Sequence, residues 1–442
     1  MKKASIDDTN VLVRDIMPIA RPLDTETDLS TLIERIGESR IVMLGEASHG
    51  TEEFYAWRRK ISQKLIADHA FNFIAVEGDW PDAWRLNQYV MTGHGENATN
   101  VLQKYQRWPA WMWANTEVVQ LAEWLRAYNK SRLRENNAHF YGLDVYSLFE
   151  SMDVVIHYLR DKHPFLARQV QARYSCFDPF FHDEIAYARH TLKFPDGCHD
   201  EVMQNLMALL EFRLEKSVKF DEEFFNAEQN ARIVRNAENY YNRMVRSDVD
   251  SWNIRDRHML NTLDLLLDHH GPDSKGIVWA HNTHIGDYRA TSMKARGEVN
   301  LGGLAREKYG SDSVCLIGFG THHGTVIASH AWDGPTQVME VPPAKEQSYD
   351  EALHQVAVQK KTNQFIVFFD AAAKSNSLAD IHGQRAIGVV YDPRHERWGN
   401  YVPTSLAHRY DAFIFIDETT ALNPLHTTFT RGRIPETWPS AQ

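Results

Sequence analysis

Short runs of β-branched and aromatic residues recur along the chain, each bounded by glycine, aspartate or histidine, and such runs are typical of buried strands. They cover residues 40–44, 72–76, 139–143, 276–280, 314–319, 325–329, 364–369, 386–391 and 412–416. Apolar residues three and four apart predict helices between the early runs, over residues 51–69, 81–90 and 116–130. This alternation predicts an α/β fold with a central, mostly parallel or mixed sheet flanked by helices.

The pattern changes between residues 147 and 270, where apolar positions three and four apart continue without a strand-like run. Such a stretch predicts a large α-helical insertion. We therefore expect an α/β core domain of residues 1–146 and 271–442 and a helical insertion of residues 147–270. Because the insertion borders the same sheet edge as the neighbouring loops, we expect it to form a cap over a cleft.

Composition narrows the range of functions. The chain has 442 residues, of which 43% are hydrophobic and 24% charged, so it is long and apolar enough to bury a large core. A formal net charge of −11 argues against a nucleic-acid or anionic-membrane partner, because both require a basic surface. No run approaches the roughly 18 apolar residues that span a membrane, so the expected partner is a small molecule. The oligomeric state is left open.

The three cysteines are Cys176, Cys198 and Cys315, which are far apart in the chain and form no CxxC spacing. We therefore expect neither a disulfide framework nor a cysteine metal site. This cysteine usage, together with a start that has no apolar signal stretch, predicts a protein of the reducing cytoplasm.

Titratable residues follow four predicted strands from different parts of the chain. In open α/β sheets, ligands bind outside the carboxyl ends of the strands, and parallel strands bring those ends to one edge. The sequence therefore predicts a single cleft that collects these side chains. They are Glu46, His49, Glu77, Asp144, His281 and His284.

The loop after the first of these strands is the most informative segment. Gly45 and Gly50 flank it and permit close backbone approaches. Thr51 is a suitable N-cap for the next helix, so His49 precedes a helix N-terminus, whose dipole favours a neutral imidazole that can accept a proton. Arg58 lies on the helix face that leans back toward this loop.

His281 and His284 raise the alternative of a metal site, since zinc requires three or four ligands and Glu46 or Glu77 could complete the set. The spacing is equally consistent with one histidine orienting its neighbour. No HExxH motif is present, and we predict no bound metal or other cofactor. The pair formed by His322 and His323 lies in a Gly-Thr-His-His-Gly-Thr segment that predicts an exposed hairpin turn.

The sequence contains no motif for a serine nucleophile or for phosphate binding. There is no Gly-x-Ser-x-Gly elbow, and Ser48 is adjacent to His49 in sequence, which is poor geometry for a serine–histidine pair. A glycine-rich phosphate loop is also absent from the sequence. Water is therefore the expected nucleophile.

Six of the twelve tryptophans follow Glu77 closely, and most of them are expected to pack helices against the sheet. Trp80 is the exception, because it neighbours acidic residues at a strand end. The candidates for substrate contacts are Asp79, Trp80 and Asp144.

Five motifs in this order resemble the erythromycin esterase family over residues 20–425. They are GEASHG at 45–50, VEGDWP at 76–81, YGLD at 141–144, WAHNTH at 279–284, and GFG at 318–320 followed by GTV at 324–326. The resemblance implies an α/β domain with a helical insertion, a deep cleft, and opening of a macrolide lactone by activated water without a metal. It also implies site residues: the family's essential histidine falls on His49, and its other site residues fall on Glu46, Arg58, Glu77, His281 and His284. The motifs are also similar to bacterial relatives described as succinoglycan biosynthesis proteins. The resemblance therefore implies the reaction class for this chain but does not imply a macrolide substrate.

The leading hypothesis is a carboxylic ester hydrolase in which His49, oriented by Glu46, deprotonates water. In this hypothesis Glu77 positions the water or a histidine, Arg58 and His284 stabilise the oxyanion, and His281 protonates the leaving oxygen or holds its neighbour. One alternative is a metal-dependent hydrolase built on His281, His284 and a carboxylate. The other is a non-catalytic homologue that binds a sugar or lipid.

Overall fold

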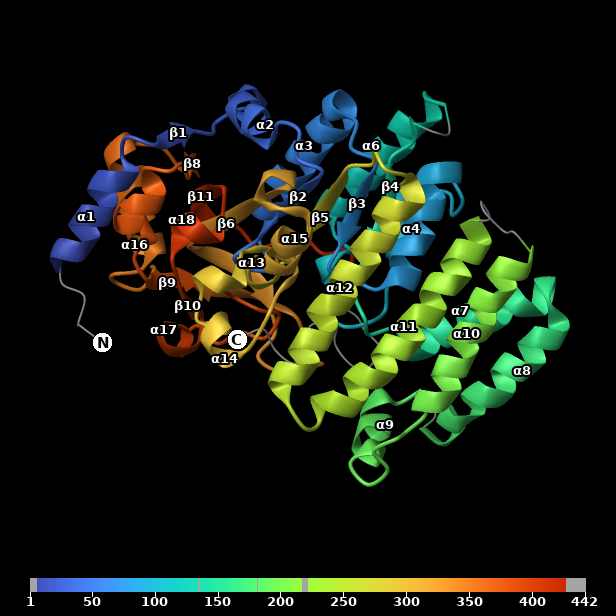
Figure 1. Ribbon diagram of the computed structural model, residues 1–442. Helices are drawn as coiled ribbons and strands as arrows, with labels where there is room; N and C mark the ends of the chain where they lie inside the picture. The colour runs from blue at the N-terminus through green and yellow to red at the C-terminus, as the bar shows by residue number, and fades with distance from the viewer. Residues whose placement is uncertain (1–5, 134–135, 181, 217–221, 427–442) are drawn as a thin grey trace.

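A mostly parallel sheet forms the centre of the computed structural model, which describes residues 6–133, 136–180, 182–216 and 222–426 (Figure 1). Its strands are β1 (Ala20–Pro22), β2 (Ile41–Leu44), β3 (Phe73–Val76), β4 (His139–Gly142), β5 (Gly276–Trp279), β6 (Val314–Ala328), β7 (Gln337–Val341), β8 (Gln364–Phe368) and β11 (Ala412–Thr419). Their order is β1-β8-β11-β6-β2-β5-β3-β4, with β7 on β6. A separate ribbon pairs β9 (His382–Arg385) with β10 (Tyr401–Thr404).

The six strands from β11 to β4 are parallel to one another, whereas β1, β7 and β8 pair antiparallel. This confirms the predicted fold class. Because the central strands run the same way, the loops after β2, β3, β4 and β5 meet at one edge of the sheet.

Helices cover both faces of the sheet (Figure 1). Those of the core are α1 (Ile6–Ile16), α2 (Ser30–Ile36), α3 (Glu52–His69), α4 (Trp80–Thr92), α5 (Ala98–Leu102), α6 (Thr116–Lys130), α13 (Asn282–Ile285), α14 (Met293–Arg296), α15 (Leu301–Tyr309), α16 (Tyr349–Lys360), α17 (Glu396–Gly399) and α18 (Leu406–Arg409). Alternate residues of β2 show the two faces: Val42 and Leu44 pack with α3 and α6, while Ile41 and Met43 pack with α1 and α16.

The described residues of the stretch predicted as an insertion form helices joined by turns, with no strand among them. The stretch comprises α7 (Leu148–Lys162), α8 (Pro164–Tyr174), the 3₁₀ helix η4 (Ser175–Phe180), α9 (Glu184–Thr191), α10 (His199–Lys216), α11 (Glu222–Met244) and α12 (Asp248–His270). Residues from α7 to α11 form a hydrophobic core of their own, whereas Met259 and Leu263 of α12 pack against the sheet. The last helix of the stretch therefore reaches the core, and this brings its polar residues to the sheet edge.

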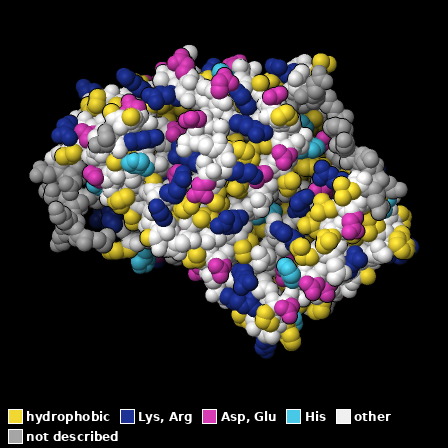
Figure 2. All heavy atoms as spheres, in the orientation of Figure 1, with side chains coloured by type: hydrophobic (Ala, Val, Ile, Leu, Met, Phe, Trp, Pro, Cys, Tyr) yellow, Lys and Arg dark blue, Asp and Glu magenta, His cyan; other side chains and the backbone are white. Residues whose placement is uncertain are grey.

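The surface of this helical region is comparatively apolar. Figure 2 shows hydrophobic side chains gathered over its helices, at the right of that view, with acidic and basic side chains interspersed elsewhere. Exposed large hydrophobic residues of the region include Phe165, Leu192, Phe194, Met207 and Leu214. In the described part of the chain, no helix combines the length and apolar character needed to cross a membrane.

One turn prediction and one strand prediction in the C-terminal part of the chain are wrong. Residues 314–319 and 325–328 are extended as predicted but belong to one long strand, β6, with Ser329 in an isolated bridge. His322 and His323 therefore lie within a strand, and His322 is buried. Pairing with β11 continues through residues 321–324 and removes the expected turn. Residues 386–391 form only isolated bridges, through Ile387 and Val390, and the strand in this region is β9.

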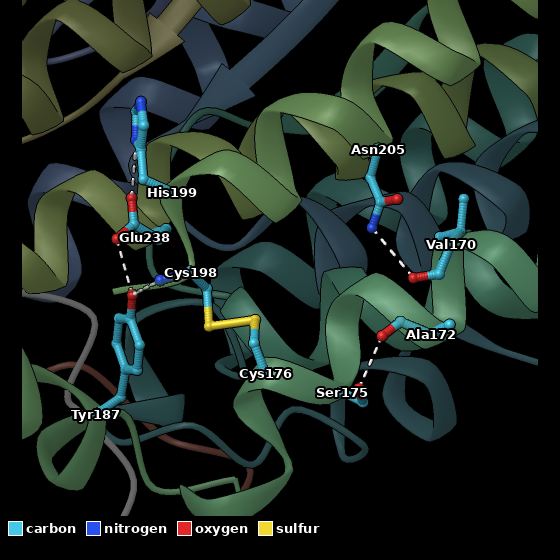
Figure 3. Close-up of a disulfide and its surroundings, with 9 residues drawn as sticks. All are labelled: Val170, Ala172, Ser175, Cys176, Tyr187, Cys198, His199, Asn205 and Glu238. Carbon is cyan, nitrogen blue, oxygen red and sulfur yellow. Dashed lines mark hydrogen bonds and ion pairs between the residues drawn. A yellow bond between two sulfur atoms is a disulfide. The ribbon is translucent and has the colours of Figure 1, made fainter. Parts of the chain in front are cut away.

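The expectation of no disulfide is also wrong. Cys176 in η4 and Cys198 just before α10 are bonded (Figure 3), while Cys315 is a buried free thiol. Tyr187 of α9 lies beside the bond, accepting a hydrogen bond from the Cys198 amide and donating one to Glu238. The 22-residue separation between the two cysteines is closed by α9 folding back, which a spacing rule does not detect. The argument from cysteine usage for a reducing compartment therefore fails.

Removing this bond is expected to destabilise the protein by about 3 kcal/mol, because a crosslink across a loop of this length reduces the entropy of the unfolded chain. The double variant Cys176→Ser/Cys198→Ser, compared with wild type in urea unfolding, measures the effect. Wild type in reductant should then match the variant. Equal stability of wild type with and without reductant would contradict the prediction.

Candidate active site

The loops after β2, β3 and β5 deliver buried polar side chains to one place. Glu46 and His49 follow β2, Glu77 follows β3, and His281 and His284 follow β5. Each of these five side chains is at most 1% exposed, as is Arg58 on α3. The loop after β2 can lie this close to its neighbours because a Cβ on Gly45 would approach the Asn282 side chain to 2.1 Å.

Glu46 holds both His49 and Arg58. Its Oε1 lies 2.9 Å from His49 Nδ1, and its Oε2 lies 2.7 Å from Arg58 Nη2. The guanidinium also lies over the rings of Tyr55 and Trp279, which fix its plane. Since a carboxylate accepts hydrogen bonds, the contact with Glu46 places the proton of a neutral His49 on Nδ1 and leaves a lone pair on Nε2.

His281 faces His49, with ring centroids 4.8 Å apart. The Nδ1 of His281 accepts a hydrogen bond from the Thr283 backbone amide at the start of α13 and lies 2.8 Å from the Thr283 hydroxyl. Burial and the neighbouring His49 lower the pKa of His281 well below its usual value. The 3.4 Å contact of Nδ1 with the Thr283 amide favours the tautomer of a neutral His281 that carries its proton on Nε2, where the ring would donate a hydrogen bond.

The Nε2 atoms of His49 and His281 are buried and have no hydrogen-bond partner among the described residues. A buried polar atom without a partner carries a free-energy cost, and such atoms concentrate where a ligand or water completes the set. The two rings therefore offer one base and one donor next to each other.

Arg255 of α12 joins Glu77 to Asp144, the second residue after β4. Its guanidinium lies 2.7 Å from Glu77 Oε1 and 2.6 Å from Asp144 Oδ2, and all three side chains are buried. The other Glu77 oxygen accepts the His281 backbone amide at 2.8 Å. Although burial raises the pKa of Glu77, the charges of His284 and Arg255 outweigh it and hold that pKa below its usual range. Glu77 is therefore a carboxylate that holds neighbours in place.

His284 is held on both ring nitrogens. Its Nδ1 lies 3.0 Å from both oxygens of Asp256, and its Nε2 lies 3.1 Å from Arg255 Nη1 and 3.4 Å from Glu77 Oε1. The indole of Trp252 stacks on the ring. Burial lowers the pKa of His284, but the carboxylates of Asp256 and Glu77 outweigh it and raise that pKa.

Sequence reasoning missed Arg255 and Asp256, although one signal was available. Both lie on the stripe of α12 that also carries Trp252, Met259 and Leu263 and faces the core. Charged residues on a buried helical stripe require partners, which here are the strand-end carboxylates and His284.

The three residues predicted to contact substrate occupy different surroundings. Asp144 is paired with Arg255, as described above. Asp79 lies 2.6 Å from Arg107, and burial raises its pKa to about 6 despite that charge. Trp80 is 1% exposed, stacks on both Trp84 and Tyr141, which also contact each other, and donates its indole N–H to Asn226. This packing gives Trp80 a structural role in holding α4 on β4, and contact of these residues with substrate stays a prediction.

His281 and His284 are poorly arranged to share a metal ion. The guanidinium of Arg255 lies against His284 Nε2, and its positive charge would repel a cation placed there. Among the described residues, one group of three potential ligands lies within reach of a common ion, namely His322, His354 and Asp417 on other elements.

A cavity of about 1030 Å³ lies within the helical region and is separate from these side chains. It is lined by residues of α7, α8, η4 and the start of α11, including Phe149, Met152, Tyr174 and Phe177. The catalytic candidates contribute nothing to its wall, so its volume is not evidence about the site at the sheet edge.

Three solved structures share the fold. A crystal structure of a succinoglycan biosynthesis protein aligns with a TM-score of 0.76 and 22% identity, over 95% of this chain and 100% of that one. A Bacillus cereus protein aligns with a TM-score of 0.78 and 23% identity, over 95% of this chain and 99% of that one. A mutant of the erythromycin esterase EreC in its open conformation aligns with a TM-score of 0.62 and 17% identity, over 92% of this chain and 96% of that one. At these identities the likeness shows the fold alone.

Sequence comparisons find relatives of the same kind as the structural comparisons. Erythromycin esterase type II of Escherichia coli is 23% identical over 286 residues, which cover 60% of this chain and 65% of that enzyme, just under two thirds of its length. The putative hydrolase YbfO of Bacillus subtilis (strain 168) is 21% identical over 432 residues, covering 91% of this chain and 89% of that protein. The sequence model of the erythromycin esterase family matches residues 66–419, from the end of α3 to the end of β11. The chain therefore belongs to the erythromycin esterase family.

Proposed function

We propose that this hydrolase-family chain cleaves a carboxylic ester or lactone with water activated by His49. The observation that carries the proposal is the pair of facing imidazoles with opposite Nε2 roles. Glu46 leaves His49 with a lone pair at Nε2, and the Thr283 amide leaves His281 with a proton at Nε2. A base and a donor whose rings are 4.8 Å apart suit a water and a carbonyl oxygen placed between them.

In the proposed reaction, His49 Nε2 takes a proton from water as the water oxygen bonds to the carbonyl carbon. The oxygen of the tetrahedral intermediate accepts a hydrogen bond from His281 Nε2–H. The Glu46 carboxylate, kept ionised by Arg58, stabilises the imidazolium that forms on His49. The carbon–oxygen bond of the ester then breaks, and the proton on His49 passes to the leaving oxygen. The products are an acid and an alcohol, or one ring-opened hydroxy acid from a lactone.

Glu77 and His284 act as positioning residues in this scheme. Glu77 holds the His281 backbone amide and Arg255, and His284 is engaged on both nitrogens. This assignment revises the sequence-based hypothesis that His284 contacts the oxyanion. Because the reacting nitrogens are buried, the segments that cover them must move before a substrate can enter.

The proposal is tested by incubating the purified protein with aryl esters of increasing chain length and with a panel of macrolides, in water enriched in ¹⁸O. We expect one labelled oxygen in the carboxylate of each product, detected by mass spectrometry. Dialysis against a chelator should leave the rate unchanged, whereas a metallohydrolase would lose activity. Thermal stabilisation by a ligand without any turnover would instead indicate a binding protein and would overturn the proposal.

The protonation of His284 is expected to make stability depend on pH. A raised pKa means that the folded protein holds this proton more tightly than the unfolded chain, so the stabilisation is complete below about pH 6.5 and is lost as pH rises through the folded pKa. Asp256→Asn removes the carboxylate that most raises the pKa. We expect the fall in unfolding free energy to move to lower pH in this variant, measured by urea unfolding at several pH values.

The matched control is Asp268→Asn, which removes an exposed carboxylate from the same helix. Its pH profile should follow that of wild type. If Asp256→Asn and Asp268→Asn show the same profile, the carboxylate does not set the protonation of His284.

A further inference from the structure

A second cluster of metal-ligating side chains lies on β6, β11 and α16 and contains none of the catalytic candidates. His322 comes from β6, Asp417 from β11 and His354 from α16, and one ligand atom from each lies within 4.8 Å of the others. We propose that these three side chains bind one divalent transition-metal ion of the zinc type, which ties α16 to the sheet. Figure 1 shows α16 on the opposite side of the molecule from α7 to α11.

The fold brings these residues together through strand register. The neighbouring parallel pairs are Thr321 with Ile416 and His323 with Glu418. His322 and Asp417 lie between these pairs, on adjacent strands and on the same face of the sheet, because side chains alternate along a strand. Helix α16 packs on β6 and β11 and places His354 there.

The metal-ligating atoms of the cluster lie close to one another. His354 Nδ1 lies 2.7 Å from Asp417 Oδ1, and the rings of His322 and His354 are stacked with centroids 3.7 Å apart. Glu351, one turn before His354 on α16, places Oε2 3.5 Å from His322 Nε2. Two imidazoles and one carboxylate thus lie within reach of a common ion, and the Glu351 carboxylate lies beside His322.

This donor set suits zinc, which is bound by histidine nitrogens and carboxylate oxygens at about 2.0–2.2 Å in tetrahedral sites. Asp417 and Glu351 would balance the charge of a divalent ion. Ligand atoms in such a site are roughly 3.3 Å apart, so the most widely separated pair must approach by up to about 1.5 Å and the stacked rings must tilt toward the ion. The side chains of His354, Asp417 and Glu351 are 26%, 16% and 22% exposed, which gives an ion a path from solvent.

A histidine–carboxylate pair elsewhere provides a matched control. His395 Nδ1 lies 2.9 Å from Asp392 Oδ2 on the surface. In the described residues this pair belongs to no group of three potential ligands. His395→Gln therefore removes one imidazole beside a carboxylate without touching the proposed site.

The test uses the full chain after dialysis against a chelator, titrated with Zn²⁺ by calorimetry and with Co²⁺ by visible absorption. We expect wild type and His395→Gln to bind Zn²⁺ at this site with the same affinity and to show tetrahedral Co²⁺ bands. His354→Gln and Asp417→Asn should each weaken binding by at least about tenfold and lose the bands. Zn²⁺ should raise the melting temperature of wild type but not of His354→Gln.

Two results would overturn the proposal. One is the absence of stoichiometric Zn²⁺ binding by folded wild type, and the other is equal Zn²⁺ affinity in His354→Gln, Asp417→Asn and His395→Gln. Circular dichroism of each metal-free variant verifies folding. If His354→Gln does not fold, the comparison of Zn²⁺ affinity uses Asp417→Asn in its place. Ester hydrolysis does not enter the readout, so the outcome is independent of the proposed catalytic activity.

Discussion

Replacing His49 by alanine is expected to lower kcat for ester hydrolysis by about 10²–10⁴-fold, because a positioned general base contributes an effect of that size. The Nε2 of His49 is the one atom in the proposed scheme that carries the proton from water to the leaving oxygen. KM should change little, because the base stabilises the transition state more than the bound substrate. Steady-state kinetics on the best ester of the panel measure both constants.

The chain offers a matched control for this variant. His395 contacts Asp392 with the same spacing of three residues and the same 2.9 Å distance as His49 and Glu46, but it lies on the surface. His395→Ala should retain wild-type kinetics. If His49→Ala also retains them while folded, His49 is not the base, and the proposed mechanism is wrong.

Replacing Arg255 by methionine is expected to cost about 3–5 kcal/mol of unfolding free energy. The substitution leaves the buried carboxylates of Glu77 and Asp144 without the cation that compensates them, and an uncompensated buried charge is costly. Methionine preserves most of the side-chain length, so lost packing contributes little. Urea unfolding followed by circular dichroism measures the change.

Arg257→Met is the matched control, since Arg257 lies two residues away on the same helix and is exposed. An exposed substitution of this kind should alter stability by no more than about 0.5 kcal/mol. Equal stabilities for the two variants would show that Glu77 and Asp144 do not depend on Arg255. The kinetic effect of Arg255→Met should be a loss of activity, because Glu77 and His284 lose their common partner.

The strand-end residues of the site could be predicted because the rule behind them is topological. Parallel strands send their carboxyl ends to one edge, so recognising four buried strands was enough to place Glu46, His49, Glu77 and His281 together. The ordered motifs added the family. Nothing in that reasoning depended on knowing which residues the helical region would contribute.

The errors have a common physical origin. The disulfide between Cys176 and Cys198 depends on α9 folding back, and the burial of His322 depends on β11 pairing past the expected turn. Arg255 and Asp256 enter the site because α12, which packs on α11, also places Met259 and Leu263 in the core beneath the sheet. Each case is a contact between segments that are distant in sequence or that fold back on themselves.

The sequence by itself determined the fold class, the family and the edge of the sheet that collects the candidate site residues. Those properties follow from local periodicity and from short motifs, which are written into neighbouring residues. Only the tertiary structure decided which imidazole nitrogen has a partner and which does not. In the proposed mechanism, that distinction separates His49 as a base from His281 as a donor and His284 as a positioning residue. Hydrogen-bond partners set the tautomer and the charge of a histidine, and those partners come from wherever the packed chain places them.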